Sequence, residues 1–321
     1  MRRREFVLLG AGLIAAERVF AQAGAPTGKI GYLHPRTAAV DSPTVAALRP
    51  AWEKLGYREP GSILLRSGEG DPARLPVLVA ELMRLGAGVL IAVGPAAVKA
   101  ATQAGSIPVV AIDQESDPIR SGLIASFSRP GGNVTGLFVD QPALAGKMTD
   151  LLKEAAPAIG RVAIVATADT TPDQLDAALG AARARALDAV TVTNSGPASY
   201  DAALGTLGGD LPTGIVQLGT PGFILDAASC ASAAQKRRLP NIAFLKVYTR
   251  DGVLMTYGPS QERYFPRAVT LADRILRGEK AADLPIDQPI EFELAINLKA
   301  ARALGLDLPP TLLARADEVI E

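Results

Sequence analysis

The sequence predicts an α/β protein made of two lobes of the same design. Short, continuously apolar runs alternate with amphipathic stretches along most of the 321 residues, which is typical of parallel strands covered by helices on both faces. The alternation then restarts in the second half of the chain. Residues 90–97 and 215–222 each read as an apolar strand, a glycine, a proline and the start of a helix. A chain of this length also exceeds the size at which a single core stops growing.

The first half of the chain alternates strand and helix. Residues 30–33 form the first expected strand, and the helix at 43–55 places four large apolar residues on one face: Val45, Leu48, Trp52 and Leu55. The remaining elements follow in the same order, with strands at 63–65, 89–93 and 109–112 and helices at 72–85 and 95–104.

The second half repeats the alternation and then changes. Its expected strands are 133–138, 162–165, 189–193, 214–218, 242–244 and 253–257, and its expected helices are 143–156, 171–186 and 222–237. A long helix over 262–277 ends at Gly278, and the alternating residues 289–296 are typical of a strand that returns to the other lobe. Residues 298–304 and 311–320 are expected to form short helices separated by Pro309 and Pro310.

The N-terminus has the form of a cleavable export signal. Basic residues 2–4 precede the apolar run 7–16, and Val19-Phe20-Ala21 is a small-x-Ala cleavage site before Gln22. The run is shorter than the roughly 20 residues of a membrane span. Residues 1–21 are therefore expected to be a signal peptide and the mature protein to be periplasmic. Arg3 and Arg4 also fit the twin-arginine pattern, so that route and the general one both remain open.

Composition excludes several functional classes. Basic and acidic residues balance at 33 each, so no general field favours nucleic acid or a membrane surface. Cys230 and His34 are the single cysteine and the single histidine, which rules out an internal disulfide, a cysteine cluster and a zinc site built on histidines. We expect no cofactor, no metal and no nucleic-acid partner, and we expect a monomer.

Two turns are the leading candidates for a ligand site. Each follows an apolar strand and opens a helix, and open α/β sheets bind ligands at the carboxyl ends of their strands. Helix N-termini there suit an anion such as a carboxylate. We expect the two turns to face each other across a cleft and to hold an anionic group, with contacts from Gly94, Ala96, Ala97, Gly219, Thr220 and Gly222.

Three further residues have both a structural and a functional interpretation. His34 follows the first strand and is either a loop histidine or a ligand contact in the cleft. Asp117 either caps the next helix or faces a ligand ammonium group, whereas the neighbouring Asp113 and Glu115 are expected to be solvated. Tyr257 either packs in the hinge or stacks on the ligand.

Several stretches together carry a family likeness: 70–76, 117–123, 128–136, 255–259, 292–299 and 313–320. In them the chain resembles the ABC-transporter substrate-binding proteins related to tryptophan/tyrosine-type importers. The resemblance implies the type I periplasmic-binding fold: two Rossmann-like lobes with the ligand between them, joined by a three-crossover hinge near Gly136, Tyr257 and Pro289. The implied lobes are residues 28–136 plus 258–288 and residues 137–257 plus 289–321. A membrane permease and an ATPase are the implied partners.

The chain departs from the family pattern where a ligand should lie. The usual Gly-Thr-Pro-Ala-Ala is replaced by residues 93–97, Val-Gly-Pro-Ala-Ala, and the common Asn-Pro by Thr167-Ala168-Asp169. Thr167 is expected to contact the ligand. The frequent Gly-Asp-Pro is here Gly219-Thr220-Pro221. The resemblance therefore carries the fold but leaves the ligand open between an amino acid and a small organic carboxylate.

The sequence predicts a solute-capture protein that breaks no bond. The alternative is a secreted α/β enzyme acting on a small molecule in the same cleft, since this fold hosts many chemistries. That enzyme would need a serine, an aspartate and His34 from loops at the strand ends. A serine hydroxyl within hydrogen-bond reach of His34 discriminates between the two. A sensor or chaperone-like module using the cleft would differ only in its partner.

Overall fold

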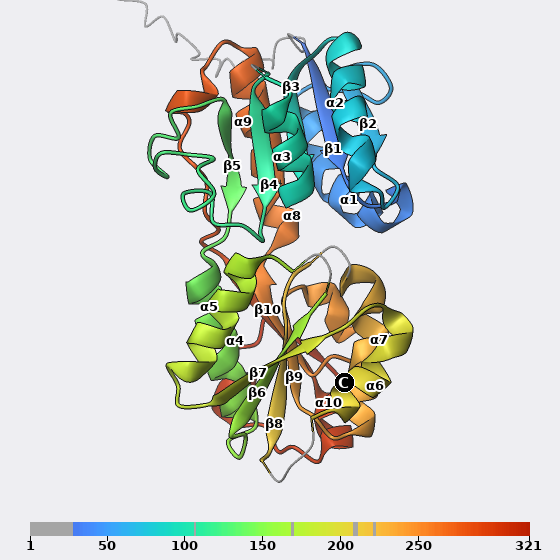
Figure 1. The fold of residues 1–321 in the computed structure, drawn as a ribbon, viewed down its shortest axis with the longest axis vertical. Helices are drawn as coiled ribbons and strands as arrows, with labels where there is room; N and C mark the ends of the chain where they lie inside the picture. Colours follow the sequence, from blue (N-terminus) through green and yellow to red (C-terminus); the bar gives the residue numbers. More distant parts are fainter. Residues whose placement is uncertain (1–27, 106, 168–169, 208–210, 221–222) are drawn as a thin grey trace, which may run out of the picture.

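A computed structural model describes residues 28–321 except 106, 168–169, 208–210 and 221–222. The predicted export signal, Gly222 and Pro221 therefore lie outside the described residues. The chain forms two α/β lobes, one above the other in Figure 1, with α8 and β10 near their junction. Among the described residues, no helix is long and apolar enough to cross a membrane.

The first lobe is built on a five-stranded parallel sheet in the order β2-β1-β3-β4-β5. Its strands are β1 (Lys29–His34), β2 (Ile63–Ser67), β3 (Ala87–Val93), β4 (Val109–Asp113) and β5 (Val134–Phe138). The central strands β3 and β4 are almost wholly buried, as the continuous apolar runs predict for a sheet covered on both faces.

Helices cover the two faces of this sheet separately. One face carries α1 (Ala38–Lys54) and α9 (Pro266–Leu276). Their apolar residues, among them Trp52 of α1, pack with Tyr57 into one core. The other face carries α2 (Leu75–Arg84), which follows the short helix η1 (Pro72–Arg74), and α3 (Pro95–Gln103). Helix α9 comes late in the sequence, after the chain has already formed several strands of the second lobe. The first lobe is therefore completed by residues from a later part of the chain.

The second lobe is built on a seven-stranded sheet in the order β12-β11-β10-β9-β8-β6-β7. Its strands are β6 (Arg161–Ala166), β7 (Asp188–Thr193), β8 (Thr213–Gln217), β9 (Asn241–Ala243), β10 (Met255–Pro259), β11 (Phe292–Asn297) and β12 (Glu318–Ile320). All pairs are parallel except β10 with β11.

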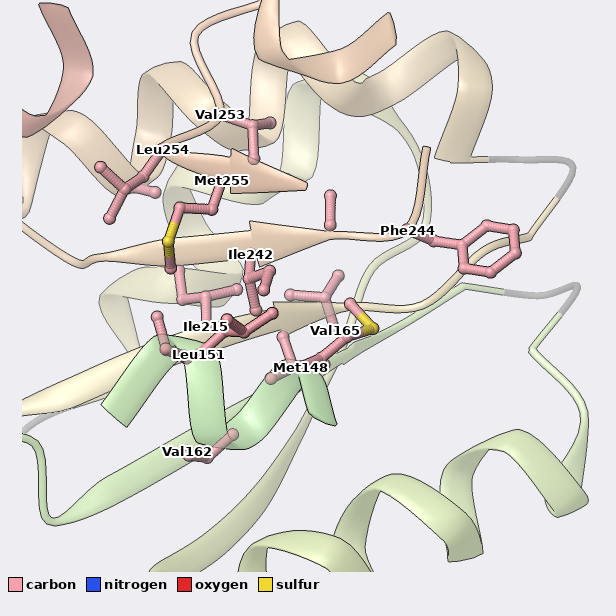
Figure 2. Packing of buried hydrophobic residues seen from close by; sticks show 14 of the residues in the cluster. Met148, Leu151, Val162, Val165, Ile215, Ile242, Phe244, Val253, Leu254 and Met255 are labelled. Atoms are coloured by element: carbon pink, nitrogen blue, oxygen red, sulfur yellow. The ribbon is translucent and has the colours of Figure 1, made fainter. Parts of the chain in front are cut away.

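The second lobe has a single large apolar core. Figure 2 shows Met148 and Leu151 of α4 (Gln141–Ala155) facing strand residues such as Val165 and Ile215. The other helices are α5 (Pro172–Arg183), α6 (Tyr200–Gly205), α7 (Phe223–Lys236), α10 (Leu298–Leu304) and α11 (Pro310–Leu313), with short helices η2 (Pro197–Ser199) and η3 (Lys246–Thr249).

The structure differs from the predicted elements most clearly in three places. The helix expected over 311–320 is instead α11 followed by β12, because the backbone of Asp317 pairs with Leu294 and β12 extends the sheet beside β11. The helix α6 was not predicted. The first helix begins at Ala38, five residues before the Pro43 taken as its start, so both Pro43 and Pro50 lie inside it.

Three chain segments cross between the lobes side by side. The chain leaves the first sheet after β5, returns after β10 into α8 (Gln261–Tyr264), and leaves again after η4 (Ala281–Asp283) toward β11. Leu137 forms a parallel bridge with Asp287, and the amide of Asp287 donates to the carbonyl of Gly136 at 2.8 Å. The amide of Ser260 points to the carbonyl of Glu291 at 3.4 Å. These backbone contacts join the crossing segments.

The hydroxyl of Tyr264 lies between two of these segments. Its oxygen is 3.1 Å from the carbonyl oxygen of Phe138 and 2.7 Å from that of Asp287. Tyr264→Phe removes this donor, and we expect a loss of about 0.5–1.5 kcal/mol in the free energy of unfolding. Tyr257→Phe is the matched control, because its ring would keep the stacking on Phe292 (centroids 5.4 Å apart). Equal urea midpoints for the two variants would contradict this role of the Tyr264 hydroxyl.

Candidate functional site

A small cavity lies where the two lobes meet at the ends of their strands. Its volume is about 30 Å³. Both lobes line it: residues from the ends of β3 and β4 in the first, and from the ends of β8 and β9 in the second. The lining comprises Arg36, Thr44, Val93, Ile112, Gln114, Glu115, Gly219, Thr220, Phe244, Leu245, Gln261 and Phe265.

The first lobe contributes opposite charges to this cavity. Arg36 follows β1, and one of its terminal nitrogens is 3.4 Å from the Thr44 hydroxyl. Glu115 follows β4 and is 8% exposed. Burial raises the pKa of the Tyr248 phenol in the second lobe, with Arg36 lowering that pKa and Glu115 raising it. The charges of Arg36 and Glu115 in the first lobe therefore influence the pKa of a buried hydroxyl in the second lobe.

The second lobe contributes hydroxyl groups and an aromatic ring. The hydroxyls of Thr167 and Thr220 are 3.0 Å apart, so two of the predicted site residues come together. The side-chain amide of Gln174 in α5 donates to the carbonyl of Gly219 at 2.8 Å and holds this turn. Figure 2 shows Phe244 at the end of its strand, apart from the other labelled side chains. A Cβ on Gly219 would overlap this ring, so only glycine fits there.

The predicted anion-binding turn of the first lobe lies beside a carboxylate of the chain itself. Gly94 precedes α3 with φ +79°, as the glycine of this turn requires. A Cβ at Gly94 would lie 3.7 Å from Oε2 of Glu115. The carboxylate of Glu115 therefore lies close to the turn that opens α3, and it would repel a ligand anion placed beside Gly94.

Asp113 and Glu115 are buried, and the expectation that they are solvated is wrong. Asp113 ends β4 and is 0% exposed. Its Oδ1 accepts from the amides of Glu115 and Ser116 at 3.0 Å each, which turns the chain after the strand. Burial raises the pKa of Asp113 and these backbone donors lower it. The turn places Glu115 at the cavity.

Other predicted site residues lie outside this cavity's lining. His34 ends β1, is 3% exposed and packs on Tyr32 with ring centroids 5.5 Å apart. Its strand partner Ser67 donates its hydroxyl to the carbonyl of Arg36 at 2.5 Å. Ala97 is fully buried in the first lobe's core, whereas Ala96 in the same helix is partly exposed.

Asp117 and Tyr257 make contacts that fit the structural interpretation of each residue. Oδ1 of Asp117 accepts from the amides of Ile119 and Arg120 at 2.9 and 3.1 Å, so it caps the turn after β4. Tyr257 stacks on Phe292 at an interplanar angle of 13° and packs against the second lobe's core. Their roles as ligand contacts stay predictions.

Sequence reasoning missed the cavity's charges and most of its apolar lining. Arg36, Gln114, Phe244, Gln261 and Phe265 were not considered. One signal existed for two of them, because Gln114 and Phe244 directly follow buried strands, where parallel sheets bind ligands. Nothing in the local sequence indicates that Gln261 and Phe265 belong to the cavity, since they arrive from a later crossing of the chain.

Larger cavities occur elsewhere, and two of them differ in character. One of about 530 Å³ lies at the amino ends of the second sheet's strands, between Ile159, Leu211 and Arg238, at the opposite end of that sheet. Another of about 460 Å³ lies between the lobes near Asp117, Asp140 and Asp173. Within the described part of the chain, no group of three or more histidine, cysteine or acidic residues is arranged to hold a metal ion.

Comparison with known proteins gives a consistent family match. A family model described as ABC transporter substrate binding protein matches residues 42–320. A protein named Tyrosine-binding protein from Clostridioides difficile (strain R20291) is 23% identical over 266 residues, which cover 80% of this chain and 74% of that protein.

Solved structures with the same architecture include liganded and ligand-free proteins. A domain from Streptococcus pneumoniae in complex with L-Trp aligns over 91% of this chain and 100% of its own, with 20% identity and a TM-score of 0.80. A ligand-free, open substrate-binding protein with adhesive properties from Clostridium difficile aligns over 91% of this chain and 99% of its own, with 20% identity and a TM-score of 0.68. The predicted α/β fold of the type I periplasmic binding proteins is confirmed.

Proposed function

Since this chain belongs to the family of ABC transporter substrate-binding proteins, we propose that it captures an amino acid or a small organic carboxylate between its two lobes. We further propose that it is the solute-binding component of an importer, and that it releases this solute to a membrane permease driven by an ATPase. No bond is broken in this function.

The observation that carries the proposal is the pair of opposite charges on one interlobe cavity. Arg36 would bind the carboxylate of the solute and Glu115 its ammonium group, since charge-assisted hydrogen bonds are the strong ones. Thr220 lines the cavity from the second lobe, and its hydroxyl would add a polar contact to the solute. Phe244 and Phe265 supply apolar surface for a side chain.

Aromatic amino acids are the first candidates. One relative is named a tyrosine-binding protein and one similar structure holds L-Trp. Two phenylalanine rings on the cavity fit an aromatic side chain, because offset aromatic pairs add about 0.5–1.5 kcal/mol beyond area burial.

Solute entry would require the lobes to part. A cavity of about 30 Å³ is far smaller than the several hundred Å³ typical of ligand pockets. The lobes, with the bounds 28–136 plus 258–288 and 137–257 plus 289–321, would move as rigid bodies about the three crossing segments.

The test is a titration of purified protein by calorimetry with three matched compounds: tryptophan, tryptamine, which lacks the carboxylate, and indole-3-propionate, which lacks the ammonium group. We expect tryptophan to bind and both analogues to bind at least tenfold more weakly, since each lacks one of the two charge-assisted hydrogen bonds. Equal binding of indole-3-propionate would remove Glu115 from the site. If neither a panel of amino acids nor one of organic acids binds, the proposed function is wrong.

Export is tested separately. We expect the mature chain to begin near Gln22 and to be found in the periplasm, because Val19-Phe20-Ala21 is the best cleavage site. N-terminal sequencing of protein from a periplasmic extract measures this. If export uses the twin-arginine route, replacing Arg3 and Arg4 by lysine should block it. A chain that starts at Met1 and fractionates with the cytoplasm would contradict export.

A further inference from the structure

We propose that the N-terminus of α5 and the loop after β4 together form a clasp. This clasp holds the two lobes closed and sets how slowly the solute leaves. The clasp consists of Thr171 and Asp173 in the second lobe and of Glu115, Asp117 and Arg120 in the first. The inference deepens the proposed function and rests on it for the effect on the solute, although the clasp itself can be tested without a ligand.

Three contacts of the clasp cross between the lobes. The Thr171 hydroxyl donates to the backbone carbonyl of Glu115 at 2.6 Å. The carboxylate of Asp173 is bound twice: the amide of Asp117 donates to Oδ2 at 3.2 Å, and the guanidinium of Arg120 lies 3.0 Å from Oδ1. A single short loop of the first lobe thus supplies every partner.

The second lobe presents this N-terminus in a fixed geometry. Thr171 and Gln174 form a capping box, in which each side chain accepts from the other's backbone amide. The same Gln174 donates to Gly219 in the turn that lines the cavity. The clasp is therefore connected by hydrogen bonds to the second lobe's part of the site.

The first lobe makes the corresponding connection through Glu115. Its backbone carbonyl accepts from Thr171, while its side chain lines the cavity. Asp113 fixes the turn by accepting from the Glu115 amide. A solute that binds the Glu115 carboxylate therefore orders the residue whose carbonyl holds the lobes together.

The size of the effect follows from exposure. The Arg120 side chain is 60% exposed, so its ion pair is worth little and is screened by salt. Arg120→Gln should raise the dissociation rate of the solute about 1.5- to fivefold. Thr171→Val removes a hydrogen bond to the Glu115 carbonyl and should raise that rate about two- to tenfold.

The experiment uses tryptophan as the probe and compares its dissociation rates by stopped flow in low salt and in 1 M NaCl. We expect salt to speed dissociation from the parent and from Arg129→Gln, an exposed first-lobe arginine, but to change Arg120→Gln much less. Thr171→Ser keeps the hydroxyl and should show the parent rate. Arg120→Gln disturbs the clasp without touching the α5 cap, and melting temperatures check that Thr171→Val still folds. Parent-like rates in both Arg120→Gln and Thr171→Val would overturn the clasp while leaving solute capture intact.

If no solute binds, small-angle scattering of the unliganded protein decides the clasp by itself. A larger radius of gyration in Arg120→Gln and Thr171→Val than in the parent and Arg129→Gln supports the clasp. This result would stand even if the proposed function were wrong. Profiles identical to the parent's overturn it.

Discussion

Replacing Gly136 by alanine is expected to destabilise the protein by about 3 kcal/mol or more. A Cβ at this position would overlap the carbonyl oxygen of Ala111 on the neighbouring strand and lie 2.5 Å from its amide nitrogen. Backbone atoms of a buried strand cannot turn aside as a side chain can, and such overpacking costs about 1–3 kcal/mol. Gly136 also has φ +142°, which an L side chain adopts only with strain of about 1–3 kcal/mol.

Gly132→Ala is the matched control, because a Cβ there meets no atom within 4 Å. Urea unfolding measures both variants, and we expect Gly132→Ala to stay within about 0.5 kcal/mol of the parent. A Gly136→Ala variant as stable as this control would mean that β4 and β5 do not pack as closely as described at the point where the chain leaves the first lobe.

Replacing Glu115 by glutamine is expected to weaken amino-acid binding about 10- to 100-fold. The substitution keeps the size of the side chain and removes its charge, and a hydrogen bond to a charged group is worth about 1.5–3 kcal/mol. The unliganded variant is expected to stay folded with a stability close to the parent's, because glutamine fills the same 8% exposed position. Loss of affinity without loss of stability is thus the signature expected for a binding residue.

The control for this charge is Glu53→Gln, an exposed glutamate of α1. Calorimetric titration of the parent and both variants, followed by urea unfolding of each, gives the two required quantities. Amino-acid affinity unchanged in Glu115→Gln would show that the ammonium group binds elsewhere.

Much of the fold could be predicted from local sequence because parallel strands buried on both faces are continuously apolar. The runs ending at Val93 and Ile112 lie in β3 and β4, close to the predicted bounds. Prediction failed where distant partners decide the structure. The tail at Glu318–Ile320 becomes a strand because β11 is available beside it, which no local periodicity shows.

The candidate site could be predicted in place but not in its charges. Its position follows from the carboxyl ends of strands, and Thr167 and Thr220 do meet there. Glu115 is hydrophilic in a polar stretch, so its sequence context indicates solvent. The turn fixed by Asp113 and the approach of the second lobe bury it, and both depend on the folded chain. The same holds for Phe265, which reaches the cavity only after the chain has crossed between lobes.

A crystal structure of the protein with the tightest-binding amino acid shows which side chains hold the solute. We expect the solute to lie between the lobes in an enlarged version of the present cavity. Its carboxylate should lie within hydrogen-bond distance of Arg36, and its ammonium group within that distance of Glu115. A solute bound in the cavity of about 530 Å³ at the far end of the second sheet, or one between the lobes that contacts neither Arg36 nor Glu115, would contradict binding by these two residues.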